Sequence, residues 1–205
     1  KQEDYKHSNI VRTFDADLGL NLRNIPIPVN PYDAFKCDVP NLSTYLYFLI
    51  NDRYYDRFQP SEKLPEGVFA GSLQLFSEKY PDKFAAHYAQ IADYSDNGVV
   101  AYNTMFAQDG FVIYVALEKP LQLINILRGG VDLSVNRRIL IIAEENARVK
   151  LLMCDHTVDN VHFVVTQVTE VFADVSAQVD VYELEENSEK VTRLNNFFSE
   201  QKDHS

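Results

Sequence analysis

Strand-like runs of apolar residues dominate the second half of the chain. From Val99 onward they follow one another through short polar corners, with no helical pattern of useful length between them. Short runs that are rich in β-branched and aromatic residues and bounded by turn residues are typical of strands. The predicted strands are GFVIYVAL (110–117), LQLINIL (121–127), RRILIIAE (137–144), ARVKLLMCD (147–155), VHFVVTQVTEVFAD (161–174), AQVDVYELE (177–185) and VTRLNNFF (191–198).

The first half of the chain mixes element types. EDYKHSNIVRTF (3–14) predicts a short helix, but the three prolines of IPIPVNPY (25–32) cannot continue one. The aromatic and β-branched stretch TYLYFLINDRYY (44–55) predicts a buried strand, and GVFAGSLQLF (67–76) predicts another. A helix is predicted from Pro81, with an apolar face formed by Phe84, Tyr88, Ile91 and Ala92 and an end within residues 93–98.

The strand region repeats itself. AEENARVK (143–150) aligns with ADVSAQVD (173–180) at an offset of 30 residues, and each has an acidic corner, an alanine and then alternating valines. AQDGFVIY (107–114) can be aligned with AEENARVK (143–150) in the same way, at an offset of 36 residues. Recurrence at this spacing is typical of a solenoid, in which each coil buries its apolar face against its neighbours. An antiparallel jelly roll would show a similar list of strands and stays open as an alternative.

We therefore predict a mainly β fold in two parts. Residues 1–98 form a small α+β N-terminal region, and residues 99–205 form the first coils of a right-handed parallel β-helix. The chain begins at Lys1 without a methionine and ends in the polar run SEQKDHS directly after a strand-like segment. We expect it to be a piece of a longer protein, truncated at the C-terminus.

The composition and the net charge argue against several classes of function. The net charge is −11, from 30 acidic and 19 basic residues, and this balance argues against nucleic-acid binding. There is no apolar run long enough to span a membrane. The two cysteines, Cys37 and Cys154, form no CxxC pair, which favours a reducing cytoplasm. Cys37 has no histidine near it in the sequence, so a structural or free thiol is the simpler interpretation.

The most chemistry-like segment surrounds Cys154. Cys154 and His156 would point to the same face of a strand, and Asp159 and His162 follow after a turn. Thiolate, imidazole and carboxylate groups bind zinc or iron, so Cys154 and His156 are candidate metal ligands. A jelly-roll metal-dependent enzyme using His156, Asp159 and His162 is the alternative function. A buried cysteine beside a polar corner is the simpler interpretation, and neither a phosphate-binding glycine loop nor a nucleophile elbow is present.

Several stretches resemble the SufB/SufD family, the scaffold subunits of the SUF iron–sulfur cluster assembly system. VNPYDAFKCDVP (29–40) and NTMFAQDG (103–110) are more similar to the SufD branch than to the SufB branch. The resemblance as a whole extends from about Glu3 to Glu200, and the following stretches carry it most clearly. They are EDYKHSNI (3–10), NTMFAQDGFVIYV (103–115), EKPLQLINIL (118–127), VNRRILIIAEENARVKLL (135–152) and VTQVTEVFADVSAQVDVYELEE (165–186).

The resemblance implies a cytoplasmic scaffold rather than an enzyme. SufB and SufD pair through their β-helices, and a C-terminal helical region of each docks a SufC ATPase. ATP would then be used only through SufC, the iron–sulfur cluster would be held transiently by the full complex, and a homodimer would form when SufB is lacking. In SufB a sulfur-handling cysteine lies at a place similar to that of Cys154. A β-solenoid that binds another partner is a third interpretation.

Two departures from the family pattern affect these expectations. The stretch YVALEKP (114–120) is shorter than its family counterpart, which suggests that residues are missing near Ala116. The family's later coils, its interface histidine and its SufC-docking helices would lie beyond Ser205. No catalytic or cofactor-binding residue is therefore assigned within this chain.

Overall fold

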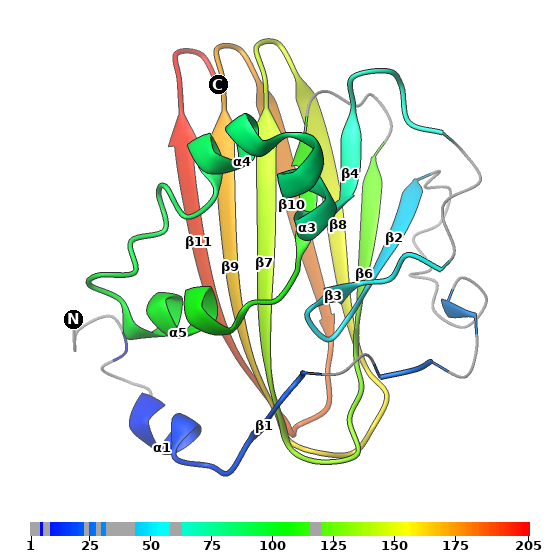
Figure 1. Ribbon diagram of the computed structural model, residues 1–205, viewed down its shortest axis with the longest axis vertical. Helices are drawn as coiled ribbons and strands as arrows, with labels where there is room; N and C mark the ends of the chain where they lie inside the picture. Colours follow the sequence, from blue (N-terminus) through cyan, green and yellow to red (C-terminus); the bar gives the residue numbers. More distant parts are fainter. Residues whose placement is uncertain are drawn as a thin grey trace.

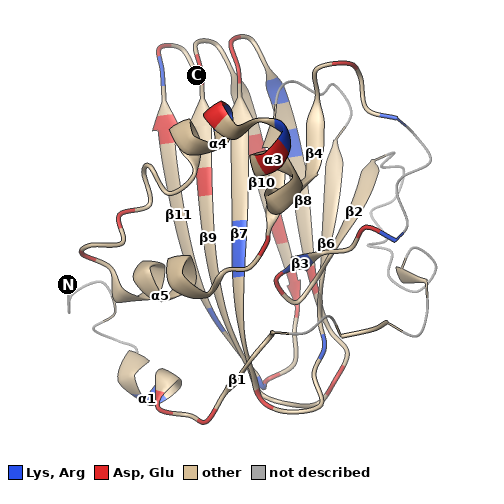
Figure 2. Cartoon of the chain, in the orientation of Figure 1, with Lys and Arg blue, Asp and Glu red and all other residues tan. Residues whose placement is uncertain are grey.

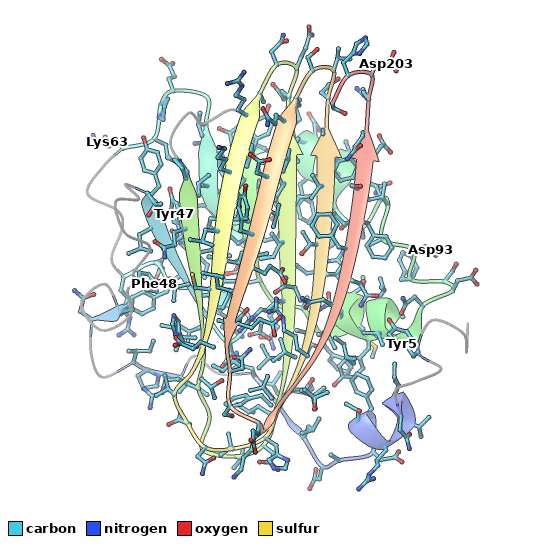
Figure 3. The ribbon with its side chains drawn as sticks, turned by 180° about the vertical axis from the view of Figure 1, so that it is seen from behind. Tyr5, Tyr47, Phe48, Lys63, Asp93 and Asp203 are labelled. Atoms are coloured by element: carbon cyan, nitrogen blue, oxygen red, sulfur yellow. The ribbon has the colours of Figure 1, made fainter. Side chains whose placement is uncertain are left out.

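Two β-sheets pack face to face, and helices cover the outer face of one of them (Figure 1). The computed structural model describes residues 5, 9–22, 25–27, 30–31, 44–57, 63–114 and 120–205. Viewed from behind, β8 and β10 of one sheet lie in front of β9 and β11 of the other (Figure 3).

Among the described residues, sheet A has the strand order β11-β9-β7-β5-β4, with β1 also paired to β7, and sheet B has the order β10-β8-β6-β2-β3. The strands of sheet A are β1 (Gly19–Leu20), β4 (Phe69–Ser72), β5 (Phe111–Tyr114), β7 (Leu133–Ala143), β9 (Phe163–Ala173) and β11 (Val191–Gln201). The strands of sheet B are β2 (Tyr45–Ile50), β3 (Arg53–Tyr54), β6 (Leu121–Leu127), β8 (Arg148–Thr157) and β10 (Gln178–Glu186).

From β7 onward the chain passes from one sheet to the other with each strand. Strands β7, β9 and β11 pair in parallel in sheet A, while β8 and β10 pair in parallel in sheet B. Ala143 pairs with Ala173 and Lys150 with Asp180, so the repeat seen in the sequence is the register of both sheets. The predicted offset of 30 residues is confirmed.

The corners between these strands repeat as well. Asn146, Ser176 and His204 each have a positive φ, near 60°, at the same place in successive corners. The amide of Asn146 donates to the carbonyl of Val175, and the amide of Ser176 donates to the carbonyl of Asp203. Each corner therefore hydrogen-bonds to the next, in the same way as the strands.

The core lies between the sheets because alternate residues of each strand point inward. Its main cluster combines Tyr45, Tyr47 and Leu49 of β2 with residues of β5, β6, β7, β8 and β9. The outer face of sheet B carries a second apolar cluster, which includes Phe48, Ile124 and Cys154.

Helices α3 (Leu73–Lys79), α4 (Pro81–His87) and α5 (Gly98–Phe106) lie on the outer face of sheet A (Figure 1). Helix α1 (Ile10–Phe14) packs beside α5 through the Phe14 and Tyr102 rings, whose centroids are 4.8 Å apart. Ser72 and Asn97 cap α3 and α5, because their side chains accept backbone N–H groups of the first turn.

The mainly β class is confirmed, and the seven strands predicted after Val99 all form. Helix α5 is a departure from that prediction. Its VVAY sequence lacks a clear helical pattern, and the helix begins because Asn97 caps it and Val99 and Val100 are buried. The predicted strand at 67–76 is wrong in its second half, where α3 begins after Ser72 and buries Leu73 and Phe76.

The helix predicted from Pro81 ends earlier than its apolar face suggests. Helix α4 stops at His87, and Ala89 adopts a positive φ of 56°. The backbone N–H groups of Ala89, Ile91 and Ala92 donate instead to the carboxylate of Glu170 on β9. A tertiary contact therefore replaces the helical hydrogen bonds.

The observed strand pairing contradicts two further expectations. The upstream repeat at an offset of 36 is wrong, because Phe111 pairs with Ile139 at an offset of 28, in sheet A rather than sheet B. The jelly-roll alternative is wrong for the described strands, because only β2–β3 and β4–β5 pair in an antiparallel manner. The proposed division at residue 98 stays a prediction, although strands on both sides of it share each sheet.

The repeated corner predicts the effect of one substitution. Ser176 is held in the left-handed region without glycine's freedom, so Ser176→Gly should raise the free energy of unfolding by about 0.5–1 kcal/mol. Ser176→Ala keeps the strain and should bring no gain. Urea unfolding checks both, and a Gly variant no more stable than the Ala variant would contradict the corner geometry.

Candidate functional site

Oppositely charged residues lie between the two sheets, where an apolar core would be expected. Arg137 of β7 forms an ion pair with Asp155 of β8, and their side chains are 0 % and 1 % exposed. Arg137 also donates through Nε to the carbonyl of Asn51 at 2.9 Å. Burying charges costs several kcal/mol per ion unless they are paired and hydrogen-bonded, so these contacts hold the sheets together at one point.

Arg193 of β11 extends this pair to the edge of sheet A. Its Nη1 lies 2.8 Å from Asp155 Oδ2 and 2.6 Å from Glu185 Oε1. Its Nη2 lies 3.3 Å from Glu183 Oε2 and donates to Gln167 at 3.2 Å. We call Arg137, Asp155, Arg193, Glu183 and Glu185 the interior charged cluster, and it joins strands β7, β8, β10 and β11.

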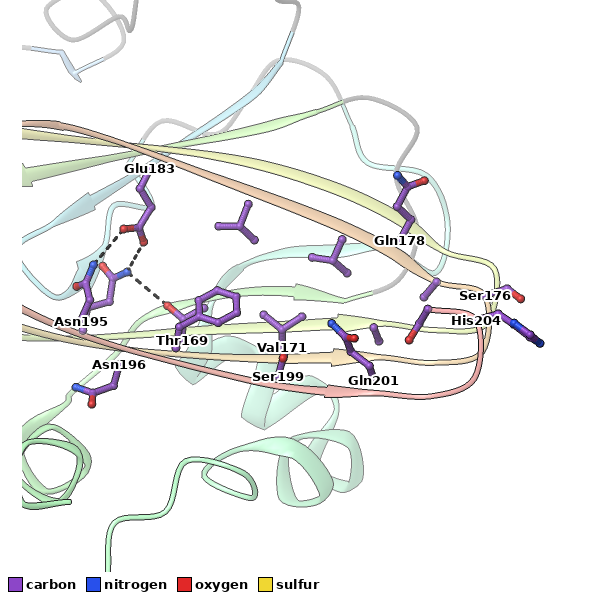
Figure 4. A pocket seen from close by; sticks show the side chains of 17 residues that line it. Thr169, Val171, Ser176, Gln178, Glu183, Asn195, Asn196, Ser199, Gln201 and His204 are labelled. Carbon is purple, nitrogen blue, oxygen red and sulfur yellow. Dashed lines mark hydrogen bonds between the residues drawn. The ribbon is translucent and has the colours of Figure 1, made fainter. Parts of the chain in front are cut away.

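A cavity of about 710 Å³ opens beside the cluster, between the edge strands β10 and β11 (Figure 4). Its polar end is lined by Gln167, Glu183 and Asn195, and the side-chain amides of Gln167 and Asn195 each donate to the Glu183 carboxylate. Asn195 and Asn196 point to opposite sides of β11. The rest of the lining includes Val171, Val179, Val181 and Phe197, and Phe197 is 54 % exposed.

A second buried ion pair lies on the outer face of sheet A. Arg138 Nη2 is 3.1 Å from Glu170 Oε2, both side chains are 2 % exposed, and the guanidinium stacks 4.6 Å from the centre of the Tyr88 ring. Figure 2 shows a basic band in the middle of β7 and an acidic band on the neighbouring strand β9, nearer its C-terminal end. Because Glu170 also accepts three backbone N–H groups from residues 89–92, this pair fastens the segment after α4 to the sheet.

A buried acid lies near the Arg137 end of the cluster. Asp52 accepts from Asn21 Nδ2 at 2.6 Å and from the Asn136 amide at 3.4 Å, and it is 1 % exposed. Burial raises the pKa of the Asp52 carboxyl above its ordinary value of 3.8, and the hydrogen bonds from Asn21 and Asn136 oppose the rise.

A third charged group ties α4 to the corner after β7. Lys83 Nζ lies 2.6 Å from Glu144 Oε1, and the Tyr114 hydroxyl donates to the same oxygen at 2.8 Å. The hydrogen bond from Lys83 lowers the pKa of Glu144, and the same contact raises the pKa of Lys83. Burial raises the pKa of Tyr114, and the hydrogen bond to Glu144 adds to the rise. The Glu144 contribution to stability is present above pH 4.5 and is lost as the pH falls.

The residues predicted around Cys154 are not brought into one site. Cys154 lies on the outer face of β8 and accepts from Gln122 at 3.7 Å, and His156 Nδ1 lies 3.2 Å from Glu186. Asp159 is engaged by Arg128 and by the amide of Gly129 in a corner. His162 lies just before β9, and its amide donates to Asp132.

Within the described part of the chain, no group of three or more His, Cys, Asp or Glu side chains is placed to hold a metal ion. A role for Cys154 and His156 as metal ligands stays a prediction. Cys37 and the short stretch near Ala116 lie outside the described residues. Among the helices that are described, none has the length and apolar character needed to cross a membrane.

The sequence patterns did not predict that these charged residues are buried. Two arginines opening a strand usually form a solvated edge, but Arg137 and Arg138 are 0 % and 1 % exposed. The run ELEENSEK (183–190) is typical of a solvated turn, yet it contains the two glutamates that meet Arg193. The available signal was the alternation of β7, which places Arg137 on the same face as Val135 and Ile139.

The contacts of the interior charged cluster join the two sheets. The hydrogen-bonding atoms of Glu183 and Asp155 are taken by Arg137, Arg193, Gln167 and Asn195. These carboxylates therefore link the two sheets beside the cavity between β10 and β11.

Two family models together match nearly the whole chain. Residues 1–123 match the model described as the SufBD protein N-terminal region. Residues 126–205 match the model described as the SUF system FeS cluster assembly, SufBD core domain. A search of curated proteins found no match.

Loss of the central carboxylate should destabilise the fold strongly. Asp155→Asn leaves two buried guanidinium groups without their shared anion, so we expect the free energy of unfolding to fall by about 3 kcal/mol or more. The matched control is Asp180→Asn on β10, whose partner Lys150 is largely exposed at 3.8 Å, and it should cost less than about 1 kcal/mol. Equal losses in the two variants, measured by urea unfolding, would rule out a special role for the cluster.

The raised pKa of Asp52 predicts how the free energy of unfolding changes with pH. Because its pKa is raised in the folded state, the folded chain binds the proton more tightly, and the Asp52 contribution to stability decreases as pH rises from 3.8 through the raised value. Asp52→Asn should remove this decrease, while Asp56→Asn at an exposed position should leave it. Unfolding free energies between pH 4 and pH 7 (about one measurement per half unit) test this. An unchanged slope in Asp52→Asn would contradict it.

Proposed function

The chain belongs to the SufB/SufD family of the SUF system, and from that membership we propose that it is a non-catalytic SufD-type scaffold subunit. The family assigns it a role in iron–sulfur cluster assembly. The observation that carries the cluster-assembly role is the match of both family models, which cover residues 1–123 and 126–205, and the choice of the SufD branch rests on the sequence motifs given below. The cluster is the cargo of this assembly rather than a resident cofactor of the chain.

We propose a SufB homologue and a SufC ATPase as its partners. In this arrangement the chain pairs with SufB, ATP enters only through SufC, and the nascent cluster is held by the whole complex in the cytoplasm. A homodimer forms when SufB is lacking. The motifs VNPYDAFKCDVP (29–40) and NTMFAQDG (103–110) favour the SufD branch over the SufB branch.

We also propose that the two sheets are walls of a right-handed parallel β-helix. Support comes from the parallel pairing of β7 with β9 and of β8 with β10, and from strands that alternate between the sheets along the chain. The corners with a positive φ at Asn146, Ser176 and His204 recur in step with the strands. A stacked framework of this kind suits a subunit that positions partners.

The structure offers a physical basis for a scaffolding role. The interior charged cluster and the Arg138–Glu170 pair fix the sheets and the helices relative to each other through buried contacts. Rigid placement is what a scaffold needs, because a partner held at a fixed position is presented to its neighbour without further ordering cost.

Co-purification tests the proposed partners. The tagged intact gene product should retain the SufB and SufC homologues of the same organism after mild lysis and size-exclusion chromatography. A parallel preparation without the SufB homologue separates direct SufC binding from binding through SufB. Asp180→Asn should behave like the natural chain, since Lys150 and Asp180 form a weak surface contact. A folded chain that elutes without either partner would contradict the proposal.

A further inference from the structure

Polar atoms without protein partners lie beside the interior charged cluster. Both side-chain atoms of Asn125, Nδ2 and Oδ1, and the Nη2 of Arg137 are buried and form no hydrogen bond with the protein. Both residues are 0 % exposed. A buried polar group left unpaired costs about 1–3 kcal/mol, so native proteins nearly always provide such atoms with a partner.

Strand order places these atoms opposite one another. The Arg137 guanidinium reaches the carbonyl of Asn51, just after β2, and the carboxylate of Asp155 on β8. Strand β6 lies between β2 and β8 in sheet B, so the guanidinium spans β6. Asn125 is the β6 residue paired in register with Asp155.

The alternation of β6 confirms the direction of the amide. Leu121 and Leu123 belong to the core between the sheets, whereas Ile124 and Ile126 belong to the outer cluster of sheet B. Asn125 therefore points inward, toward Arg137. The Asn125 amide and the Arg137 guanidinium therefore both lie between β6 of sheet B and β7 of sheet A.

The chemistry of these atoms defines their ligand. Oδ1 needs a hydrogen-bond donor, whereas Nδ2 and Nη2 need acceptors. A bare anion cannot donate to Oδ1, and a metal cation cannot accept hydrogen bonds from Nδ2 or Nη2. A small neutral molecule that both donates and accepts satisfies all three atoms.

We propose that Asn125 and Arg137 bind an internal water molecule that bridges β6 of sheet B and β7 of sheet A. Buried water typically makes about three hydrogen bonds to groups of this kind and becomes part of the fold. The water completes the hydrogen bonding of the guanidinium, so it is a third element of the joint formed by Arg137 and Asp155. This inference does not depend on the proposed scaffold function.

Nuclear magnetic resonance tests the site directly. In the ¹⁵N-labelled natural chain, the Asn125 side-chain amide should show a cross-peak to water with the sign of a long-lived complex. Magnetic relaxation dispersion should count one fewer long-lived water in Asn125→Leu than in the natural chain. Asn125→Ser retains a donor and an acceptor and should keep that water. Lack of a long-lived cross-peak in the natural chain would overturn the proposal.

Thermal unfolding gives a second readout with opposite expectations. If Asn125 binds water, Asn125→Leu loses these hydrogen bonds and leaves Nη2 unpaired, so its Tm should fall by about 3 °C or more. If the amide has no ligand, the same substitution removes two unsatisfied atoms and adds apolar burial, so its Tm should rise. A higher Tm would therefore overturn the site, and the water cross-peak of the natural chain decides the matter even if the variant fails to fold.

Discussion

Strands β7 and β9, and strands β8 and β10, pair in parallel at a constant offset of 30 residues, and the placement of the buried groups follows from this register. A shift by one residue would turn every inward side chain outward. Arg137 would then leave the space between the sheets, and Asp155 would lose its partner. The repeated corners, with a positive φ at Asn146 and Ser176, set the length of each passage between the sheets and so maintain the register.

The buried charges are matched to this register. Arg137 and Arg193 both reach Asp155 in it, and removing one partner of a buried ion pair is strongly destabilising. On the outer face the same principle fastens the helices, since Glu170 binds Arg138 and the backbone after α4. The two pairs use adjacent residues of β7, Arg137 inward and Arg138 outward, so this strand connects the core to the helical cover.

Local pattern predicted the strands and their stacking but not the charged joints. The match between residues 143–150 and 173–180 carries the register because both segments turn the same corner. Residues 107–114 share the corner composition but pair differently, since short motifs do not specify partners.

Helix α3 was missed because a short apolar run suits a strand or a helix equally. The burial of Arg137 and Arg138 depends on Asp155 and Glu170, which lie on other strands, so the alternation of β7 alone does not identify their partners. The alternative enzyme site of His156, Asp159 and His162 does not form among the described residues, and Asp159 binds Arg128 instead.

The parallel register of the two sheets is consistent with the scaffold role that we propose for this member of a family involved in iron–sulfur cluster assembly. The most direct test is the incorporation of ⁵⁵Fe into iron–sulfur client proteins in cells that lack this gene product but retain the SufB and SufC homologues. We expect client labelling to fall several-fold and to recover when the intact gene product is supplied again. Normal labelling in its absence, with the SUF system as the only assembly route, would contradict a role for the chain in cluster assembly.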